Sequence, residues 1–111
     1  MDDDWSSELR KGSIQLCILA LLRRTPKYGF QILKEMREMS EGYLDLKEGT
    51  LYPALHRLEK RGLLRSEWVI EDEKPRRYYS LTPRGRSALE EGLEQWRWMV
   101  EGCNRLLGGS Q

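Results

Sequence analysis

The chain has 111 residues, a length that predicts one small domain and excludes most multi-domain enzymes. Hydrophobic residues make up 39% of it and charged residues 33%, a composition typical of folded rather than disordered proteins. The longest apolar run covers only seven residues, 16–22, whereas a membrane-spanning helix requires roughly 20. We therefore expect a single domain without a membrane segment.

The first residues and the cysteines indicate in which cellular compartment the protein is found. The chain begins Met1-Asp2-Asp3-Asp4, which is acidic where a secretory signal is basic and then apolar, so we expect a cytoplasmic protein. Cys17 and Cys103 lie far apart in apolar stretches, and their spacing fits neither a disulfide framework nor a metal site. We interpret both as reduced core thiols, and we expect no metal or other cofactor.

The net charge of +1 is distributed unevenly. Residues 47–86 contain ten Lys or Arg against six Asp or Glu, a balance of +4, and the rest of the chain contains nine against twelve, a balance of −3. Residues 74–86 hold five cations and no acid. Such a stretch suits an anionic polymer, although a solvated charged surface is the alternative reading of the cluster by itself.

Helical periodicity dominates the first sixty residues. Apolar residues at helical spacing predict a helix from about 7 to 24, ended by Thr25-Pro26; they are Ile14, Cys17, Ile18, Leu21 and Leu22. A second helix is expected from about 28 to 39, with Phe30, Leu33 and Met36 on its apolar side. A third is expected from about 48 to 61, with Gly62 just past its end.

The period changes after Gly62. Alternating residues predict two strands at about 64–70 and 78–81, with Leu64, Trp68 and Ile70 on one face of the first. The polar residues 71–76 between them predict a hairpin tip. Thr82 followed by Pro83 then predicts the N-cap and first position of a last helix, which runs to about residue 107.

This order of elements predicts a mainly α fold with a small β-hairpin wing. Residues 1–81 form a winged helix-turn-helix, residues 82–111 form a C-terminal dimerisation helix, and the two make one compact unit. Winged helices also dock proteins, so the layout leaves open a protein–protein interaction module without DNA binding. An enzyme is the weakest reading, because the chain has one His and no nucleophile–base spacing or glycine-rich phosphate loop.

The third helix carries the predicted DNA-reading surface. Since Leu51, Leu55 and Leu58 fix its buried side, the opposite side faces outward with small residues at its start and cations further along, as a major groove requires. The predicted contact residues are Gly49, Thr50, Tyr52, Pro53, His56, Arg57 and Lys60. An ordinary solvated helix surface is the alternative.

The hairpin is expected to bring cations to neighbouring phosphates or to the adjacent minor groove. Lys74, Arg76 and Arg77 are the candidates. The acids at 71–73 lie beside them and would weaken the attraction by pairing. We therefore favour Arg76 and Arg77 over Lys74.

The last helix shows a heptad seam with spacings of four and three residues, formed by Leu89, Leu93, Trp96, Val100, Cys103 and Leu107. The seam is short, so we expect it to pack with the apolar first helix in a homodimer. Two recognition helices roughly 34 Å apart would then read a palindromic operator in double-stranded DNA.

Trp96 lies in the middle of this seam. An indole suits shape-specific contacts, and one interpretation is a slot in which a small planar aromatic ligand lies between the two Trp96 rings. Trp5 or Met99 would line that slot. A filled interface is the equally open alternative.

Four strings of residues resemble the PadR family of bacterial transcriptional regulators: 28–30, 48–59, 62–64 and 77–85. The most specific are Gly-Thr-Leu-Tyr-Pro at 49–53 and Tyr-Tyr-Ser-Leu-Thr at 78–82, and the resemblance covers about residues 9–107. With a single C-terminal helix, the chain is similar to the short subfamily. That resemblance implies a homodimeric repressor whose ligands bind at or near the dimer interface.

The resemblance also implies DNA contacts from Tyr28, Thr50, Tyr52, Pro53, Arg57, Lys60, Arg76 and Arg77. Trp96 resembles the tryptophan of drug-responsive members. One departure is Lys47-Glu48, where many members have Ser-Pro. Loss of a serine cap costs about 1 kcal/mol, and Glu48 partly offsets it through the helix dipole while placing a negative charge near phosphate.

Overall fold

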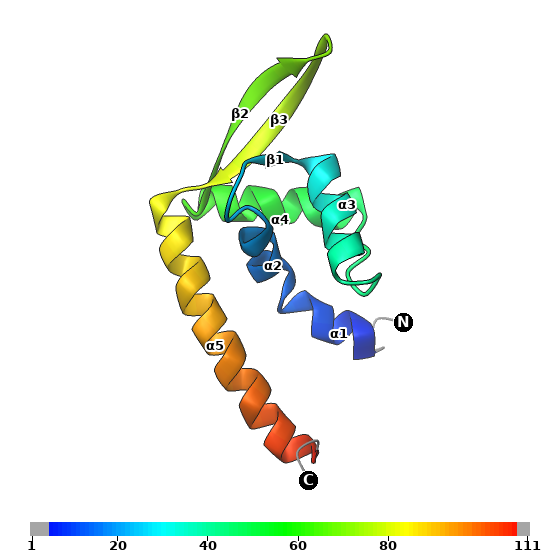
Figure 1. Ribbon diagram of the computed structural model, residues 1–111, viewed down its shortest axis with the longest axis vertical. Helices are drawn as coiled ribbons and strands as arrows, with labels where there is room; N and C mark the ends of the chain where they lie inside the picture. The colour runs from blue at the N-terminus through cyan, green and yellow to red at the C-terminus, as the bar shows by residue number, and fades with distance from the viewer. Residues whose placement is uncertain (1–4, 109–111) are drawn as a thin grey trace.

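The computed structural model describes residues 5–108, and it has the predicted fold class, mainly helical with a small antiparallel sheet (Figure 1). The acidic residues 1–4 lie outside this range. In chain order the elements are α1 (Trp5–Lys11), α2 (Ile14–Leu21), β1 (Lys27–Tyr28), α3 (Gly29–Met39), α4 (Glu48–Lys60), β2 (Leu64–Glu71), β3 (Lys74–Leu81) and α5 (Pro83–Leu107). Within residues 5–108, no helix combines the length and apolarity needed to cross a membrane.

The core lies where α2, α3 and α4 meet beneath the base of the sheet (Figure 1). The largest fully buried side chains are Ile18, Leu22, Ile32, Leu51, Leu55, Leu58 and Tyr79. The central position of α2 explains its continuous apolar sequence, because this helix contacts α3, α4 and α5 on different sides.

The single N-terminal helix expected over 7–24 is instead two helices separated at Gly12–Ser13. Ser13 turns back on the preceding helix, since both its N–H and its hydroxyl donate to the carbonyl of Arg10, at 3.1 and 3.2 Å. A serine that bonds to nearby backbone and a flexible glycine beside it favour such a break. The apolar periodicity of residues 14–22 gave no sign of it.

Helix α3 has nearly the expected bounds, but Phe30 is 64% exposed rather than part of the apolar side. The buried face runs instead through Gly29, Ile32 and Met36. Strand β1 was not predicted. It pairs Lys27 with Tyr79 and Tyr28 with Tyr78, and two residues are too few to show a period in the sequence.

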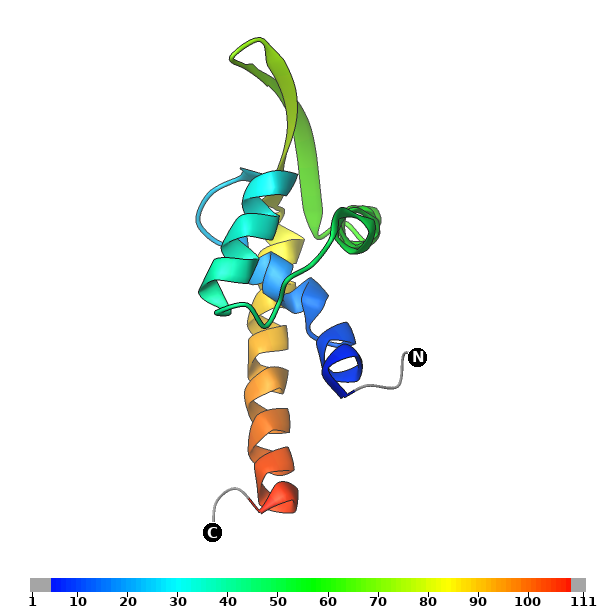
Figure 2. The same ribbon diagram turned by 90° about the vertical axis from the view of Figure 1, so that its right-hand side faces the viewer.

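The wing is the β2–β3 hairpin, residues 64–81, and it projects well beyond the helices (Figures 1 and 2). The predicted tip at 71–76 is too long, because the strands pair as far as Glu71 and Lys74 and only Asp72 and Glu73 form the turn. Both have positive φ, 51° and 63°, which matches the backbone twist of a two-residue hairpin turn.

Helix α5 begins as predicted. The Thr82 hydroxyl accepts from the Gly85 N–H at 3.0 Å and donates to the Gly62 carbonyl at 2.6 Å, so one side chain caps the helix and ties it to the end of α4. Its first half packs against α2 through Leu89, while its second half extends away from the body (Figure 2).

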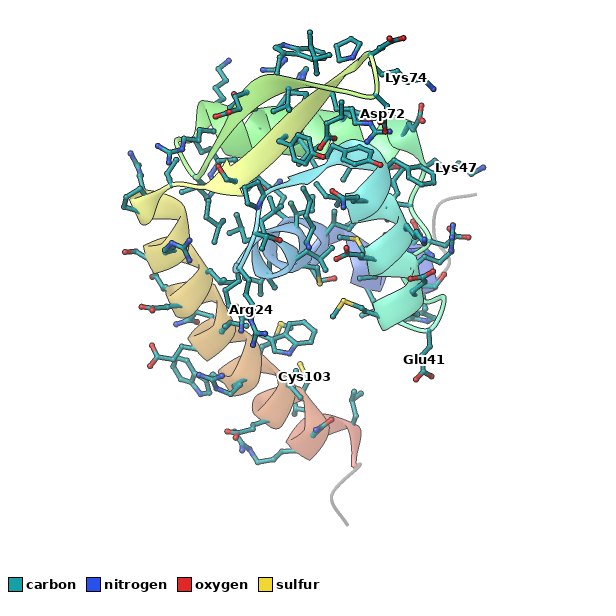
Figure 3. All side chains as sticks on the ribbon, turned by 45° about the horizontal axis from the view of Figure 1, so that its top comes forward. Arg24, Glu41, Lys47, Asp72, Lys74 and Cys103 are labelled. Atoms are coloured by element: carbon teal, nitrogen blue, oxygen red, sulfur yellow. The ribbon has the colours of Figure 1, made fainter. Side chains whose placement is uncertain are left out.

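The two cysteines differ from expectation in part. Cys17 is half-buried in α2, and burial raises the pKa of its thiol. Cys103 is exposed on the projecting half of α5, so its interpretation as a core thiol is wrong (Figure 3). Val100 and Leu107 lie at helical spacing from it, but this half of α5 is largely uncovered by the other elements of residues 5–108.

Candidate nucleic-acid interface

The outward side of α4 is exposed over its whole length. Its inner side buries Leu51, Ala54, Leu55 and Leu58 in the core. The predicted reading residues Gly49, Thr50, Tyr52, Pro53, His56, Arg57 and Lys60 are all exposed. Sequence periodicity alone therefore identified which side of this helix is available to a partner.

The start of α4 lacks a side-chain cap. Lys47 is the N-cap residue and makes no capping hydrogen bond, while the N–H groups of Thr50 and Leu51 donate to its carbonyl at 2.9 and 3.0 Å. Glu48 stands in the first turn. The N-terminus of α4 therefore presents backbone N–H dipoles that favour a bound anion, while the nearby carboxylate of Glu48 disfavours one.

Tyr52 joins α4 to the start of α3. Its ring lies so close to Gly29 that a Cβ on that glycine would be 2.7 Å from the ring carbon that bears the hydroxyl. The pKa of Tyr52 is raised, first by burial and then by the negative charge of Glu48, so the phenol stays protonated and can donate a hydrogen bond. The side chain remains partly open to a partner.

Tyr28 lies at the root of the wing rather than on the face of α4. It is half-buried, it is the N-cap of α3, and its N–H donates to the Gln31 side chain at 3.2 Å. Its ring meets Tyr78 edge-on at 5.4 Å and lies under the Arg76 guanidinium at 4.6 Å. These contacts give Tyr28 a structural role in holding the wing to α3.

Both arginines of the wing are paired. Arg76 contacts Glu71 at 3.1 Å, and the Tyr78 hydroxyl donates to the same carboxylate at 2.5 Å. These bonds hold the pKa of Glu71 below its ordinary value, and the hydrogen bond from Tyr78 is the larger cause. The charge of Arg76 is therefore partly neutralised within the wing.

Arg77 ties the wing to α4. Its Nε donates to the Ser66 hydroxyl at 2.9 Å, its terminal nitrogen is 3.5 Å from Glu59, and Ser66 in turn donates to Glu59 at 2.8 Å. Lys74, in contrast, has no carboxylate within 4 Å among residues 5–108, and it lies at the outer end of the hairpin (Figure 3). The acids near the wing therefore pair with Arg76 and Arg77 and not with Lys74.

A groove of about 390 Å³ separates the wing from α3 and α4. Its lining residues are Tyr28, Gly29, Phe30, Tyr52, His56, Trp68, Pro75, Arg76, Arg77 and Tyr79. Sequence reasoning did not propose Phe30, Trp68 or Pro75 for this surface. The alternation of β2 placed Trp68 on a strand face, but it could not show that the strand extends past the core.

The residues of the heptad seam fall into two groups. Leu89 is buried in the core of its own chain and Leu93 packs against that core. Beyond them Val100 is half-buried, while Trp96, Cys103 and Leu107 are exposed. Of the residues expected to line the ligand slot, Trp5 is 78% exposed on α1 and Met99 shares a shallow hollow with Gln95 and Trp98.

Residues 18–91 match the model of the PadR-like family of transcriptional regulators. The chain belongs to the PadR-like family. It is 38% identical over 102 residues to the transcriptional regulator Rv3488 of Mycobacterium tuberculosis, covering 92% of this chain and 90% of that protein. It is 30% identical to Uncharacterized protein X of Lysinibacillus sphaericus over 96 residues, 86% of this chain and 88% of that one.

Solved structures support the same conclusion. A transcriptional regulator from Clostridium thermocellum superimposes with a TM-score of 0.83 at 34% identity, covering 89% of this chain and 97% of that one. A PadR-family transcriptional regulator from Eggerthella lenta gives 0.81 at 38% identity, covering 90% and 86%. This PadR-like protein is therefore a transcriptional regulator rather than an enzyme, and membership of the family implies that it binds DNA.

Proposed function

We propose that this PadR-like regulator is a cytoplasmic homodimeric repressor that binds a palindromic operator in duplex DNA. The observation that carries the proposal is the exposed outer side of α4, where Thr50, His56, Arg57 and Lys60 point away from a fully packed inner side. In a dimer, two such helices would enter successive major grooves of the duplex, and each wing would lie over a flanking minor groove.

Charge supports DNA as the partner. Arg57 and Lys60 are exposed in the last turns of α4, and neither is ion-paired within residues 5–108. Lys47 at the start of α4 and Lys74 on the wing add further exposed cations, and both lie on the same side of the molecule (Figure 3). Cations spaced along an extended surface suit the phosphates of a duplex better than a compact anionic ligand.

Unpartnered apolar surface supports a dimer. Helix α1 has no buried residue, and Trp5 and Leu9 on it are 78% and 64% exposed. The far half of α5 exposes Leu106 and Leu107 at 87% and 81%. Large apolar side chains exposed on two helices are available to a second copy of the chain. We therefore place the dimer interface on α1 and on α5 from Trp96 onward, with Leu89 and Leu93 serving the core of each protomer.

A ligand slot between the two Trp96 rings completes the proposal. Trp96 is 43% exposed on the half of α5 assigned to the interface, where a second copy would bring its own indole. Trp5 and Met99 are large apolar residues with exposed side chains, the kind of residue that lines sites for planar apolar ligands. Binding there would alter the spacing of the two α4 helices and release the operator.

The test is a titration of duplex DNA at two salt concentrations. If a dimer makes about 6–10 phosphate contacts, its affinity should fall roughly 10³–10⁵-fold between about 50 and 200 mM salt. Arg57→Ala with Lys60→Ala should lower the slope of log affinity against log salt by about four per dimer. Lys34→Ala with Arg37→Ala on α3 removes the same charge elsewhere and should leave the slope unchanged.

A protein-docking module without DNA binding is the second candidate function. The groove between the wing and the helices α3 and α4, which we call the wing groove, favours it, because its lining includes Phe30 and Trp68, each 64% exposed. Such a surface would bind its partner with little dependence on salt. A wild-type protein that ignores every duplex at low salt would support this candidate and contradict the repressor.

A further inference from the structure

The wing carries large apolar side chains that are exposed in the described part of the chain. Trp68 is 64% exposed and Ile70 is 75% exposed on β2. The strand register places Ile70 directly opposite Pro75 and Trp68 directly opposite Arg77. Residues directly opposite in an antiparallel pair share one face of the sheet. Trp68, Ile70 and Pro75 therefore lie on one face close to the turn, together with Arg77, whose guanidinium is 5.7 Å from the centre of the Trp68 ring. We call the three apolar residues the wing patch.

The wing patch lies on the same side of the molecule as the outer face of α4. Trp68 and Pro75 line the wing groove together with Tyr52 and His56 of α4. The opposite face of β2 carries Val69, which is half-buried and lines a separate hollow behind the wing. A duplex that contacts α4 would therefore meet the wing through Trp68, Ile70 and Pro75.

The chemistry of this patch does not suit phosphate. Large apolar side chains gain free energy by leaving water, and in a duplex they do so against sugars and between base steps. The turn itself, Asp72 and Glu73, is acidic and disfavours contact between the extreme tip and phosphates (Figure 3). Lys74 beside the patch supplies a cation for a flanking phosphate. Apolar contact in the minor groove therefore accounts for this face better than an electrostatic clamp does.

We propose that the wing patch enters the minor groove beside each operator half-site and opens a base step, so that the regulator bends its DNA. This inference rests on the proposed function. Partly unstacking a base step kinks a duplex by roughly 20–90°, and pyrimidine–purine steps yield most easily. The wing would then select flexible steps in the flanks of the operator without hydrogen bonds to their bases.

The experiment uses the full-length protein and duplexes that the wild type selects from a random-sequence pool. Energy transfer between dyes on the two duplex ends measures the bend, and sequencing of the selected pool measures the preference for flexible steps. The variants are Trp68→Ala and Ile70→Ala. Val69→Ala is the matched control, because it truncates an apolar residue on the same strand whose side chain faces the other way. Circular dichroism verifies the fold of each variant.

We expect the wild type and Val69→Ala to bend the duplex and to enrich flexible flanking steps. Trp68→Ala and Ile70→Ala should lose most of the bend and the flank preference, with affinity lower by about tenfold. If either variant keeps the full bend, or loses affinity without losing the bend, insertion of the wing patch into a base step is contradicted. The proposed function as a DNA-binding regulator is unaffected by that result. If the wild type binds no duplex, the proposed function itself fails, and the wing patch becomes a candidate protein-docking surface.

Discussion

The ring of Tyr52 on the reading helix α4 lies against the backbone of Gly29, the first residue of α3. A Cβ at position 29 would be 2.7 Å from one ring carbon and 3.0 Å from another, closer than non-bonded carbons approach. The absence of a side chain at position 29 therefore leaves the space that the Tyr52 ring occupies. This contact stands beside the surface proposed to read DNA.

Gly29→Ala should lower the free energy of unfolding by about 1–3 kcal/mol, because the added methyl displaces the Tyr52 ring from its place against the start of α3. Chemical denaturation at fixed protein concentration measures this. Gly49→Ala is the control, since a Cβ there meets nothing within 4 Å. It should leave stability unchanged or raise it by up to about 1 kcal/mol. Equal stability of the two variants would contradict the proposed role of the contact.

Substitutions of Arg77 and Lys74 distinguish the structural contribution of a wing cation from the contribution of its charge to DNA binding. Arg77→Ala removes the contacts to Ser66 and Glu59 and should lower stability by about 1 kcal/mol in addition to weakening DNA binding. Lys74→Ala removes the same charge without an ion pair, so stability should stay within about 0.5 kcal/mol while DNA affinity falls. Thermal unfolding together with DNA titration distinguishes them. An Arg77→Ala protein as stable as the wild type would show that the tie to α4 is dispensable.

Glu71 should make the wing sensitive to acid. The hydrogen bond from Tyr78 and then the contact with Arg76 hold its folded-state pKa below the ordinary value of 4.5. Because the pKa of Glu71 is lower in the folded than in the unfolded protein, its ionised carboxylate stabilises the fold at a pH above the unfolded-state pKa. This contribution is lost as the pH falls through the folded-state pKa. Wild type should therefore exceed Glu71→Gln in stability at neutral pH, and the difference should shrink as the pH falls below 4.5 and through the folded-state pKa of Glu71. A constant difference across that range would contradict the prediction.

Substitutions in the turn of the wing should raise the stability of the protein. Asp72 and Glu73 both adopt positive φ, which costs roughly 1 kcal/mol or more for a residue other than glycine or asparagine. Asp72→Asn combined with Glu73→Gly should raise the free energy of unfolding by about 1 kcal/mol. DNA affinity should also rise, because two negative charges leave the surface that approaches phosphate. Denaturation and DNA titration test both effects, and a loss of stability would show that the turn is not of this type.

Trp96→Ala should separate ligand binding from DNA binding. With rhodamine 6G as a planar cationic probe, the wild type should show indole quenching and release of bound duplex, and the variant should bind the duplex but respond to neither. Glu90→Ala is the control, since Glu90 is exposed on the same helix before the half assigned to the interface and the slot. If Trp96→Ala still releases DNA, the ligand site moves elsewhere, for example to the hollow of about 560 Å³ between α2 and α3.

Much of the fold followed from residues that act locally. Three leucines at helical spacing identified the inner side of α4, and its outer side was exposed as expected. Thr82 and Pro83 marked the start of α5 correctly, because an N-cap and a proline at the first position depend only on neighbouring residues. The family resemblance, carried by the strings on α4 and β3, was confirmed by the match over residues 18–91.

Other features depended on contacts between residues far apart in the chain. Strand β1 exists because Tyr28 meets Tyr78, and Arg77 is a tie rather than a free cation because β2 brings Ser66 beside Glu59. The exposure of Trp68 depends on how far the hairpin extends past the core. None of these follows from a periodic pattern.

The amino-acid sequence by itself determined the order of the helices, the outer side of the reading helix and the start of the last helix, because periodicity and capping act within a few residues. Only the tertiary structure decided which apolar side chains are buried. Phe30, Trp68 and Ile70 belong to well-formed elements, yet they remain exposed because no apolar face within residues 5–108 packs against them. Burial is a property of what packs against a face, and a local pattern cannot specify its partner.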